Sequence, residues 1–73
     1  MSDGATPLRI DARGLRCPWP ALRLARALRS GAQSVDILAD DPAAEREIGA
    51  LASAHGLTVQ RVEIDGVDGF RIG

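Results

Sequence analysis

The sequence predicts an α+β fold in which four strands and two helices follow one another in the order βαβαββ. Short segments of alternating apolar residues are typical of strands, and two longer segments carry apolar residues at helical spacing. Asp-Gly pairs near the end of the chain predict a hairpin. Two amphipathic helices need one apolar sheet face, so we expect a two-layer α/β sandwich with both helices on one face of a four-stranded mixed sheet.

The chain of 73 residues is long enough for one domain. We expect residues 1–7 to form a flexible leader and residues 8–73 to form the domain. Residues 8–11 alternate apolar and charged side chains, which predicts a short first strand. A helix should then begin between Cys17 and Pro20 and end near Ser30, with Gly31 as its stop. Its apolar stripe consists of Ala21, Leu24, Ala25 and Leu28.

The second half of the domain repeats this pattern of strand and helix. The alternation of Val35, Ile37 and Ala39 predicts a second strand. Asp41 followed by Pro42 is typical of an N-cap and a first helical residue, so Asp40 and Asp41 are interpreted as structural. The apolar stripe of the second helix consists of Ala44, Ile48, Leu51 and Ala52. Gly56, directly after His55, should end this helix.

Residues 57–64 have the composition of a third strand. Its alternation slips phase at residues 60–61, which predicts a bulge or a strong twist. Two Asp-Gly pairs, at residues 65–66 and 68–69, predict a hairpin that leads into a last short strand over residues 70–72.

Charge is distributed unevenly along the chain, although the net charge is only -1. Residues 1–39 carry six Arg and three Asp, whereas residues 40–73 carry three Arg and seven acidic residues. A polarised surface of this kind suits docking to charged proteins. It falls short of the strongly basic surface of a nucleic-acid binder, so direct nucleic-acid binding is not expected. We find neither a membrane-length apolar run nor a secretory signal, and therefore expect a cytoplasmic protein without a membrane partner.

The chain has one cysteine, Cys17, and therefore no internal disulfide. Only His55 could join it as a soft metal ligand, so we expect neither a metal site nor a cofactor. A single thiol without a secretion signal fits a reducing compartment.

The residues around Cys17 point to a reactive thiol. Cys17 lies where a loop enters a helix, and the positive end of a helix dipole favours thiolate and lowers the pKa of a cysteine. Arg13 and Arg16 should act in the same direction. Pro18 and Pro20 make the helix entry rigid. Most lone cysteines are inert core residues, but a loop position between Arg and Pro favours the reactive alternative.

Trp19, Arg23 and Arg26 fall on the side of the first helix opposite its apolar stripe. An exposed Trp beside a reactive cysteine is typical of a docking anchor. The alternatives are a Trp folded onto the core and two arginines on a merely solvated face. The candidate binding residues are therefore Arg13, Gly14, Arg16, Pro18, Trp19, Pro20, Arg23 and Arg26.

Residues 11–20 resemble the Cys-Pro-x-Pro signature of the TusA/SirA-like sulfur-carrier family, and residues 39–48 resemble the start of its second helix. The resemblance covers residues 8–73 and implies a βαβαββ two-layer sandwich. It also implies a persulfide relay. A cysteine desulfurase or a rhodanese-type enzyme would load sulfur onto Cys17, which would pass it to an acceptor protein. The destinations in the family include tRNA thiolation, molybdenum-cofactor assembly and sulfur oxidation, and the sequence does not choose among them.

The sequence departs from the family pattern at Trp19, where a smaller or acidic residue is expected, and in the tight connection at residues 30–33. A carrier of this kind is not an enzyme in the usual sense, because one thiol without an acid–base partner cannot complete a turnover alone. Two other interpretations remain open from the residues. One is a non-catalytic RNA- or protein-binding regulatory module. The other is a selenium- or redox-handling thiol protein.

Overall fold

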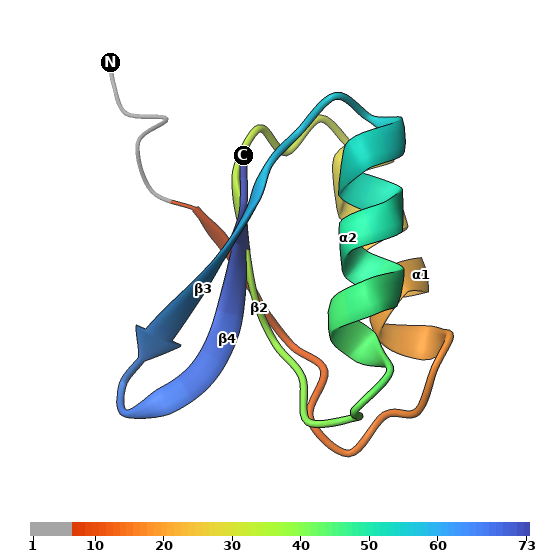
Figure 1. Ribbon diagram of the computed structural model, residues 1–73. Coiled ribbons are helices and arrows are strands. Elements are labelled where there is room, and N and C mark those ends of the chain that lie inside the picture. Colours follow the sequence, from red (N-terminus) through yellow and green to blue (C-terminus); the bar gives the residue numbers. More distant parts are fainter. Residues whose placement is uncertain (1–6) are drawn as a thin grey trace.

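The structure is a computed structural model that describes residues 7–73 (Figure 1). The leader expected over residues 1–7 therefore lies outside the described residues, except for Pro7. The predicted order βαβαββ is confirmed, with these elements in sequence: β1 Leu8–Asp11, α1 Trp19–Arg29, β2 Val35–Leu38, α2 Ala44–Ala54, β3 Val59–Ile64 and β4 Val67–Ile72.

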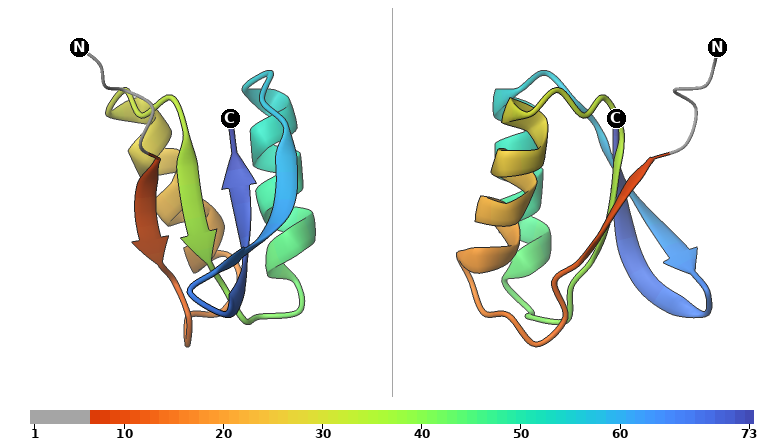
Figure 2. Two further views of the ribbon diagram at one scale, coloured as in Figure 1. Left: turned by 90° about the vertical axis from the view of Figure 1, so that its left-hand side faces the viewer. Right: turned by 180° about the vertical axis from the view of Figure 1, so that it is seen from behind.

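The four strands form one mixed sheet in the order β1-β2-β4-β3. β1 and β2 are parallel, whereas β4 pairs antiparallel with both β2 and β3. Both helices cover the same face of the sheet, as Figures 1 and 2 show. The predicted two-layer sandwich is therefore confirmed. Because β1 and β2 run in the same direction, the loops that follow them meet at one end of the sheet.

The core lies between this sheet face and the two helices. Val35, Ile37 and Ile72 of the central strands are fully buried against Leu24 of α1 and Ile48 of α2. Burying a large aliphatic side chain contributes about 1.5–3 kcal/mol, so these contacts account for much of the stability of so small a domain. The buried stripe of α2 is the one that the sequence predicts, except that Leu51 is half-buried.

Both helices differ from the prediction in detail. The buried stripe of α1 is centred on Pro20, Leu24 and Ala27 rather than on the four residues expected, of which only Leu24 is fully buried. α2 begins at Ala44, so Asp41 is not its N-cap. Asp41 instead accepts a hydrogen bond from the Ala43 backbone N–H at 3.2 Å and leaves its second carboxylate oxygen for another partner. The glycines after the helices, at residues 31 and 56, have positive φ and end them as predicted.

The hairpin is longer and more regular than predicted. β4 begins at Val67, so the pair at residues 68–69 lies within the strand and the turn consists only of Asp65 and Gly66. Both turn residues have positive φ, as a two-residue type I′ turn requires. The register from Val59 to Ile64 is continuous, which excludes the bulge. The phase slip reflects the strong twist that curls the hairpin out of the sheet (Figure 1).

The twisted hairpin also covers part of the second face of the sheet, and all four residues of β2 are buried. β2 ends at Leu38 and does not include Ala39, which the sequence placed in this strand. Asp36 is 5% exposed and accepts two hydrogen bonds from the Arg71 guanidinium, at 2.8 and 2.9 Å. Leu38 lies under the hairpin beside Gly69 and Ile64. The face opposite the helices is therefore only partly open to water. Within residues 7–73, neither helix has the length and the apolar composition needed to cross a membrane.

Candidate functional site

Cys17 lies in the loop between β1 and α1, and its side chain is half-buried. The base of this loop is anchored by Ala12, which is fully buried and donates its backbone N–H to the Leu38 carbonyl at 2.8 Å. Leu15 closes a turn by donating to the Ala12 carbonyl at 3.2 Å. The Cys17–Pro18 peptide bond is cis. The loop is therefore attached to the sheet at its base, and the cysteine lies near its far end.

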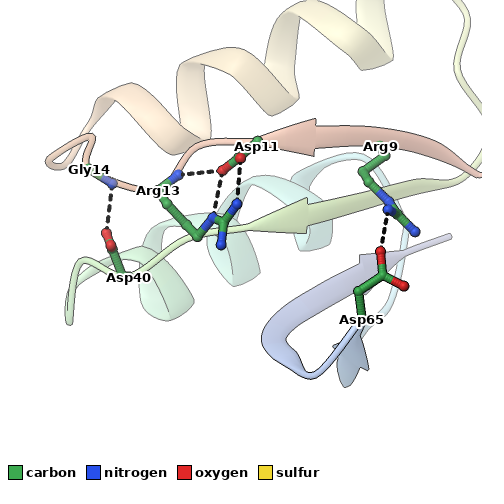
Figure 3. Close-up of polar contacts among 6 residues, drawn as sticks. All are labelled: Arg9, Asp11, Arg13, Gly14, Asp40 and Asp65. Atoms are coloured by element: carbon green, nitrogen blue, oxygen red, sulfur yellow. Dashed lines mark hydrogen bonds and ion pairs between the residues drawn. The ribbon is translucent and has the colours of Figure 1, made fainter.

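Two carboxylates from the loop after β2 hold the cysteine loop in place. The Gly14 backbone N–H donates to Asp40 Oδ1 at 2.9 Å (Figure 3), and Gly14 has a φ of +82° that few other residues adopt. The Cys17 backbone N–H donates to Asp41 Oδ2. Because the same Asp41 carboxylate accepts from the Ala43 backbone, it links the cysteine loop to the start of α2. Asp40 and Asp41 thus fix the position of Cys17.

The pKa of the Cys17 thiol is raised, so the lowering expected from the sequence is wrong. Partial burial of the thiol is the largest cause. The negative charges of Glu47 and Asp41 act in the same direction, as does hydrogen bonding to the Glu47 carboxylate, and the positive charge of Arg46 opposes them in part. The surroundings of Cys17 therefore favour the protonated thiol over the thiolate.

The positive groups expected near the thiol do not act on it, because the helix amides are missing or bonded and the arginine charges lie near other groups. Pro18 and Pro20 have no backbone N–H, and the Trp19 N–H donates to the Arg16 carbonyl at 2.8 Å, so the first turn of α1 offers few free amides. Arg13 turns back onto Asp11 at 2.7 Å (Figure 3), which lowers the pKa of that carboxyl to about 2.

The charge of Arg16 acts mainly on another group. Hydrogen bonds from the Cys17 and Ala43 backbone N–H groups are the largest causes of the lowered pKa of Asp41, and the charge of Arg16 adds to them. Neither Arg13 nor Arg16, the two arginines that precede the cysteine in its loop, is therefore found to support a thiolate.

The raised pKa predicts how fast Cys17 reacts with a small alkylating agent. The iodoacetamide rate should rise with pH through a midpoint at or above the ordinary thiol value of about 8.5. Glu47→Gln should move the midpoint to lower pH, because a carboxylate beside the thiol disfavours the thiolate. Glu63→Gln on the distant edge strand β3 is the matched control and should leave it unchanged. A wild-type midpoint well below 8.5 would contradict this electrostatic account.

The predicted docking residues on α1 lie together on one side of the helix. Trp19 is 59% exposed, which excludes the alternative of a Trp folded onto the core. Trp19, Arg23 and Arg26 line one groove between α1 and β1. Arg16 and Pro18 are exposed close to Cys17 in the same loop. Pro20 is a correction to the candidate list, because it is fully buried and can only fix the start of α1 rather than contact a partner.

Sequence reasoning missed Asp40, Asp41 and Glu47 as parts of the site. The signal for Asp40 and Asp41 was their position directly after the second strand, since the loops that follow parallel neighbouring strands meet. Glu47 lies one helical turn after Ala43 on α2, and its direction toward Cys17 depends on how the two helices pack. Within residues 7–73, no three side chains of the kinds that bind metals are grouped so that they could hold an ion.

The fold and the site together define a small single-thiol α+β domain, with its cysteine fixed in a loop at the start of a helix. The model of the family described as sulfurtransferase TusA matches residues 8–72. The chain therefore belongs to the TusA sulfurtransferase family, as the Cys-Pro-x-Pro signature predicts. Its fold is similar to the crystal structure of a SirA-like protein from Desulfitobacterium hafniense, with a TM-score of 0.76 and 29% identity, over 89% of this chain and 93% of that one.

The chain is also similar to a protein of Archaeoglobus fulgidus that is described as a candidate sulfur carrier. The two are 41% identical over 49 residues, which is 64% of this chain and 64% of the relative. The matched region thus spans somewhat less than two thirds of the relative's length.

Proposed function

We propose that Cys17 accepts sulfane sulfur from a donor protein, carries it as a persulfide and passes it to an acceptor protein. In loading, the Cys17 sulfur attacks the terminal sulfur of a donor cysteine persulfide. A new S–S bond forms at Cys17, the donor S–S bond breaks, and the donor leaves as a thiol that takes up the proton released by Cys17. The number of disulfide-type bonds is unchanged, so the transfer needs no external oxidant or reductant.

The observation that carries this proposal is the attachment of the single thiol to the fold by its own backbone. The bond from the Cys17 N–H to Asp41 presents one sulfur in one position at the end of a rigid loop. The nearby Glu47 carboxylate can take up the thiol proton when the sulfur attacks. Carriage from one protein to another needs a fixed sulfur that a partner can reach, and it needs no substrate cavity.

Family membership supports sulfur-relay partners of two kinds. The donor would be a cysteine desulfurase or a rhodanese-type enzyme, and the acceptor would be a protein of a pathway that consumes sulfur, such as tRNA thiolation, cofactor assembly or sulfur oxidation. The chain would act as a carrier between them rather than as an enzyme with its own turnover.

Intact mass spectrometry tests the relay directly. After incubation with a cysteine desulfurase and cysteine, the protein should gain the mass of one sulfur atom, and a reducing agent should remove it. The matched control is Cys17→Ser, which replaces the only thiol and should gain nothing. A wild-type protein that gains no sulfur from either a desulfurase or a rhodanese-type donor would contradict the proposal.

The surface formed by Trp19, Arg23 and Arg26 should control how fast the donor docks. Arg23→Glu combined with Arg26→Glu should slow loading most at low salt, because exposed charges are screened at higher ionic strength. Trp19→Ala should slow loading at both salt concentrations while leaving the alkylation rate of Cys17 nearly unchanged, because it removes an exposed anchor. Loading rates measured with the desulfurase at two salt concentrations test both. Wild-type loading in both variants would mean that docking uses another face.

A further inference from the structure

The edge of the sheet at β1 is open. β1 is the first strand in the order β1-β2-β4-β3, and among the residues that the structure describes it pairs only with β2. The backbone N–H groups of Leu8 and Ala12 point toward β2, where they donate to Ser34 and Leu38. The alternation of a strand therefore directs the N–H and C=O groups of Arg9 and Asp11 away from the sheet. Within residues 7–73 no strand lies beyond them, as the left view of Figure 2 shows.

A groove with an apolar surface runs beside this open edge, between β1 and α1. Its lining includes the three large hydrophobic side chains that are exposed in the described chain: Leu8 at 48%, Trp19 at 59% and Leu22 at 49%. Ile10 and Ala27 complete the apolar part of the lining. Single exposed hydrophobic residues are ordinary, but three that gather in one groove indicate an interaction surface.

The charge around the groove has one sign. Arg23, Arg26 and Arg29 line it together with the apolar residues, and no acidic residue among residues 7–73 does. The ion pairs found within residues 7–73 involve other arginines, on β1, β3, β4 and the cysteine loop. These three guanidinium groups are therefore available to carboxylates from outside the chain.

We propose that β1 and this groove bind an extended, acidic segment of a partner protein, which pairs with Arg9 and Asp11 as an added strand. Large apolar side chains of the segment would face α1 and cover Leu8 and Leu22, and carboxylates beside them would reach the three arginines. Strand addition supplies backbone hydrogen bonds, and the groove supplies specificity. Only two residues of β1 offer outward backbone groups, so the apolar and charged contacts supply much of the affinity.

Charge argues against a second copy of this chain as the occupant. Two copies paired along their β1 edges would bring two α1 helices together, each with three arginines on the groove and no acidic residue to offset them. Trp19 at the end of the groove lies two residues after Cys17, so the segment would belong to a protein that exchanges sulfur with it. Only this last assignment rests on the proposed function.

The test uses the whole chain and a synthetic probe, the peptide Ac-Glu-Phe-Glu-Leu-Glu-Phe-Glu-amide, observed by backbone amide shifts in NMR titrations. Binding should shift the amides of β1 and α1, and high salt should weaken it. Leu22→Ser and Arg26→Glu should each weaken it about tenfold or more. Leu22 and Arg26 are both exposed, so these changes should leave the fold intact. Arg46→Glu on α2 reverses a charge outside the groove and should bind the probe like the wild type.

Two altered peptides separate the parts of the proposal. A peptide with Lys in place of Glu should not bind, and a peptide N-methylated at the residues whose N–H groups would face β1 should bind more weakly because it cannot pair with β1. Equal binding of the N-methylated peptide would overturn strand addition. Equal binding by Leu22→Ser and Arg26→Glu would overturn the groove as the site. A dimer in sedimentation that Leu22→Ser dissociates would overturn the choice of occupant. Cys17→Ser should bind the probe like the wild type, so that loss of sulfur loading and loss of docking are measured apart.

Discussion

The Cys17→Ala protein is expected to take up no sulfur and yet to melt within about 4–8 °C of the wild type. Loading is lost because Cys17 is the only thiol in the chain. Stability is nearly kept because the side chain is half-buried in a loop and lies outside the core cluster. Its main structural contact, the hydrogen bond to Asp41, comes from the backbone N–H, which alanine retains. The cost should be about 1 kcal/mol or less.

Mass spectrometry after exposure to donor and thermal melts of both proteins test this expectation. Asp41→Ala is the informative companion, because it keeps the thiol and removes the carboxylate that accepts from the Cys17 and Ala43 backbones. We expect Asp41→Ala to load slowly and to be less stable than Cys17→Ala. A Cys17→Ala protein that melts far below the wild type would show that the thiol is a packed core group rather than a presented one.

Gly69→Ala is expected to cost more stability than any exposed substitution discussed above. A β-carbon at residue 69 would lie 2.8 Å from the Ile37 carbonyl oxygen, 3.1 Å from Leu38 and 3.2 Å from Ile64. The nearest atom is backbone of the central strand β2, which cannot move without disturbing the pairing of β4 with β2. Overpacking of this kind typically costs about 1–3 kcal/mol and occasionally more, out of roughly 4–11 kcal/mol for a domain of this length.

Gly49→Ala is the matched control for Gly69→Ala. Gly49 lies inside α2, and a β-carbon there would meet nothing within 4 Å. Alanine should therefore stabilise the helix by roughly 0.5–1 kcal/mol. Urea unfolding of the two variants should give midpoints on opposite sides of the wild type. Equal midpoints would mean that β4 has room for a β-carbon at residue 69. The close approach of β4 to β2 would then not require a glycine there.

The sequence predicted the order of elements because each helix and strand has its own apolar period. Leu24 and Ile48 lie on helical stripes and are buried as that period requires. The hairpin was predicted less well, because two Asp-Gly pairs compete for the turn. In the structure the turn consists of residues 65–66. Residues 68–69 lie inside β4, because β3 and β4 pair continuously from Val59 to Ile64. Burial of Leu38 on the second sheet face depends on the curl of this hairpin, which no local pattern shows.

The site was predicted in part. The position of Cys17 before α1 and the exposure of Trp19 follow from residues that are neighbours in sequence. The raised pKa of the thiol does not, because it depends on partial burial of the thiol and on the charges of Glu47 and Asp41, which follow Cys17 by more than 20 residues. Local reasoning also counted Arg13 as a cation near the sulfur, whereas its guanidinium is bound to Asp11. Long-range packing thus reversed the electrostatics that the local sequence suggests.

The two prolines and the two acidic side chains around Cys17 have a consequence for oxidative damage. Peroxides attack the thiolate, and the products beyond sulfenic acid are not readily reversed. Pro18 and Pro20 withhold amides that would stabilise an anion, and Asp41 and Glu47 repel one. In the proposed relay, the sulfur of the unloaded carrier is therefore expected to be a poor target for hydrogen peroxide. A carrier of the proposed kind would then avoid inactivation between two transfers while its sulfur is only half-buried.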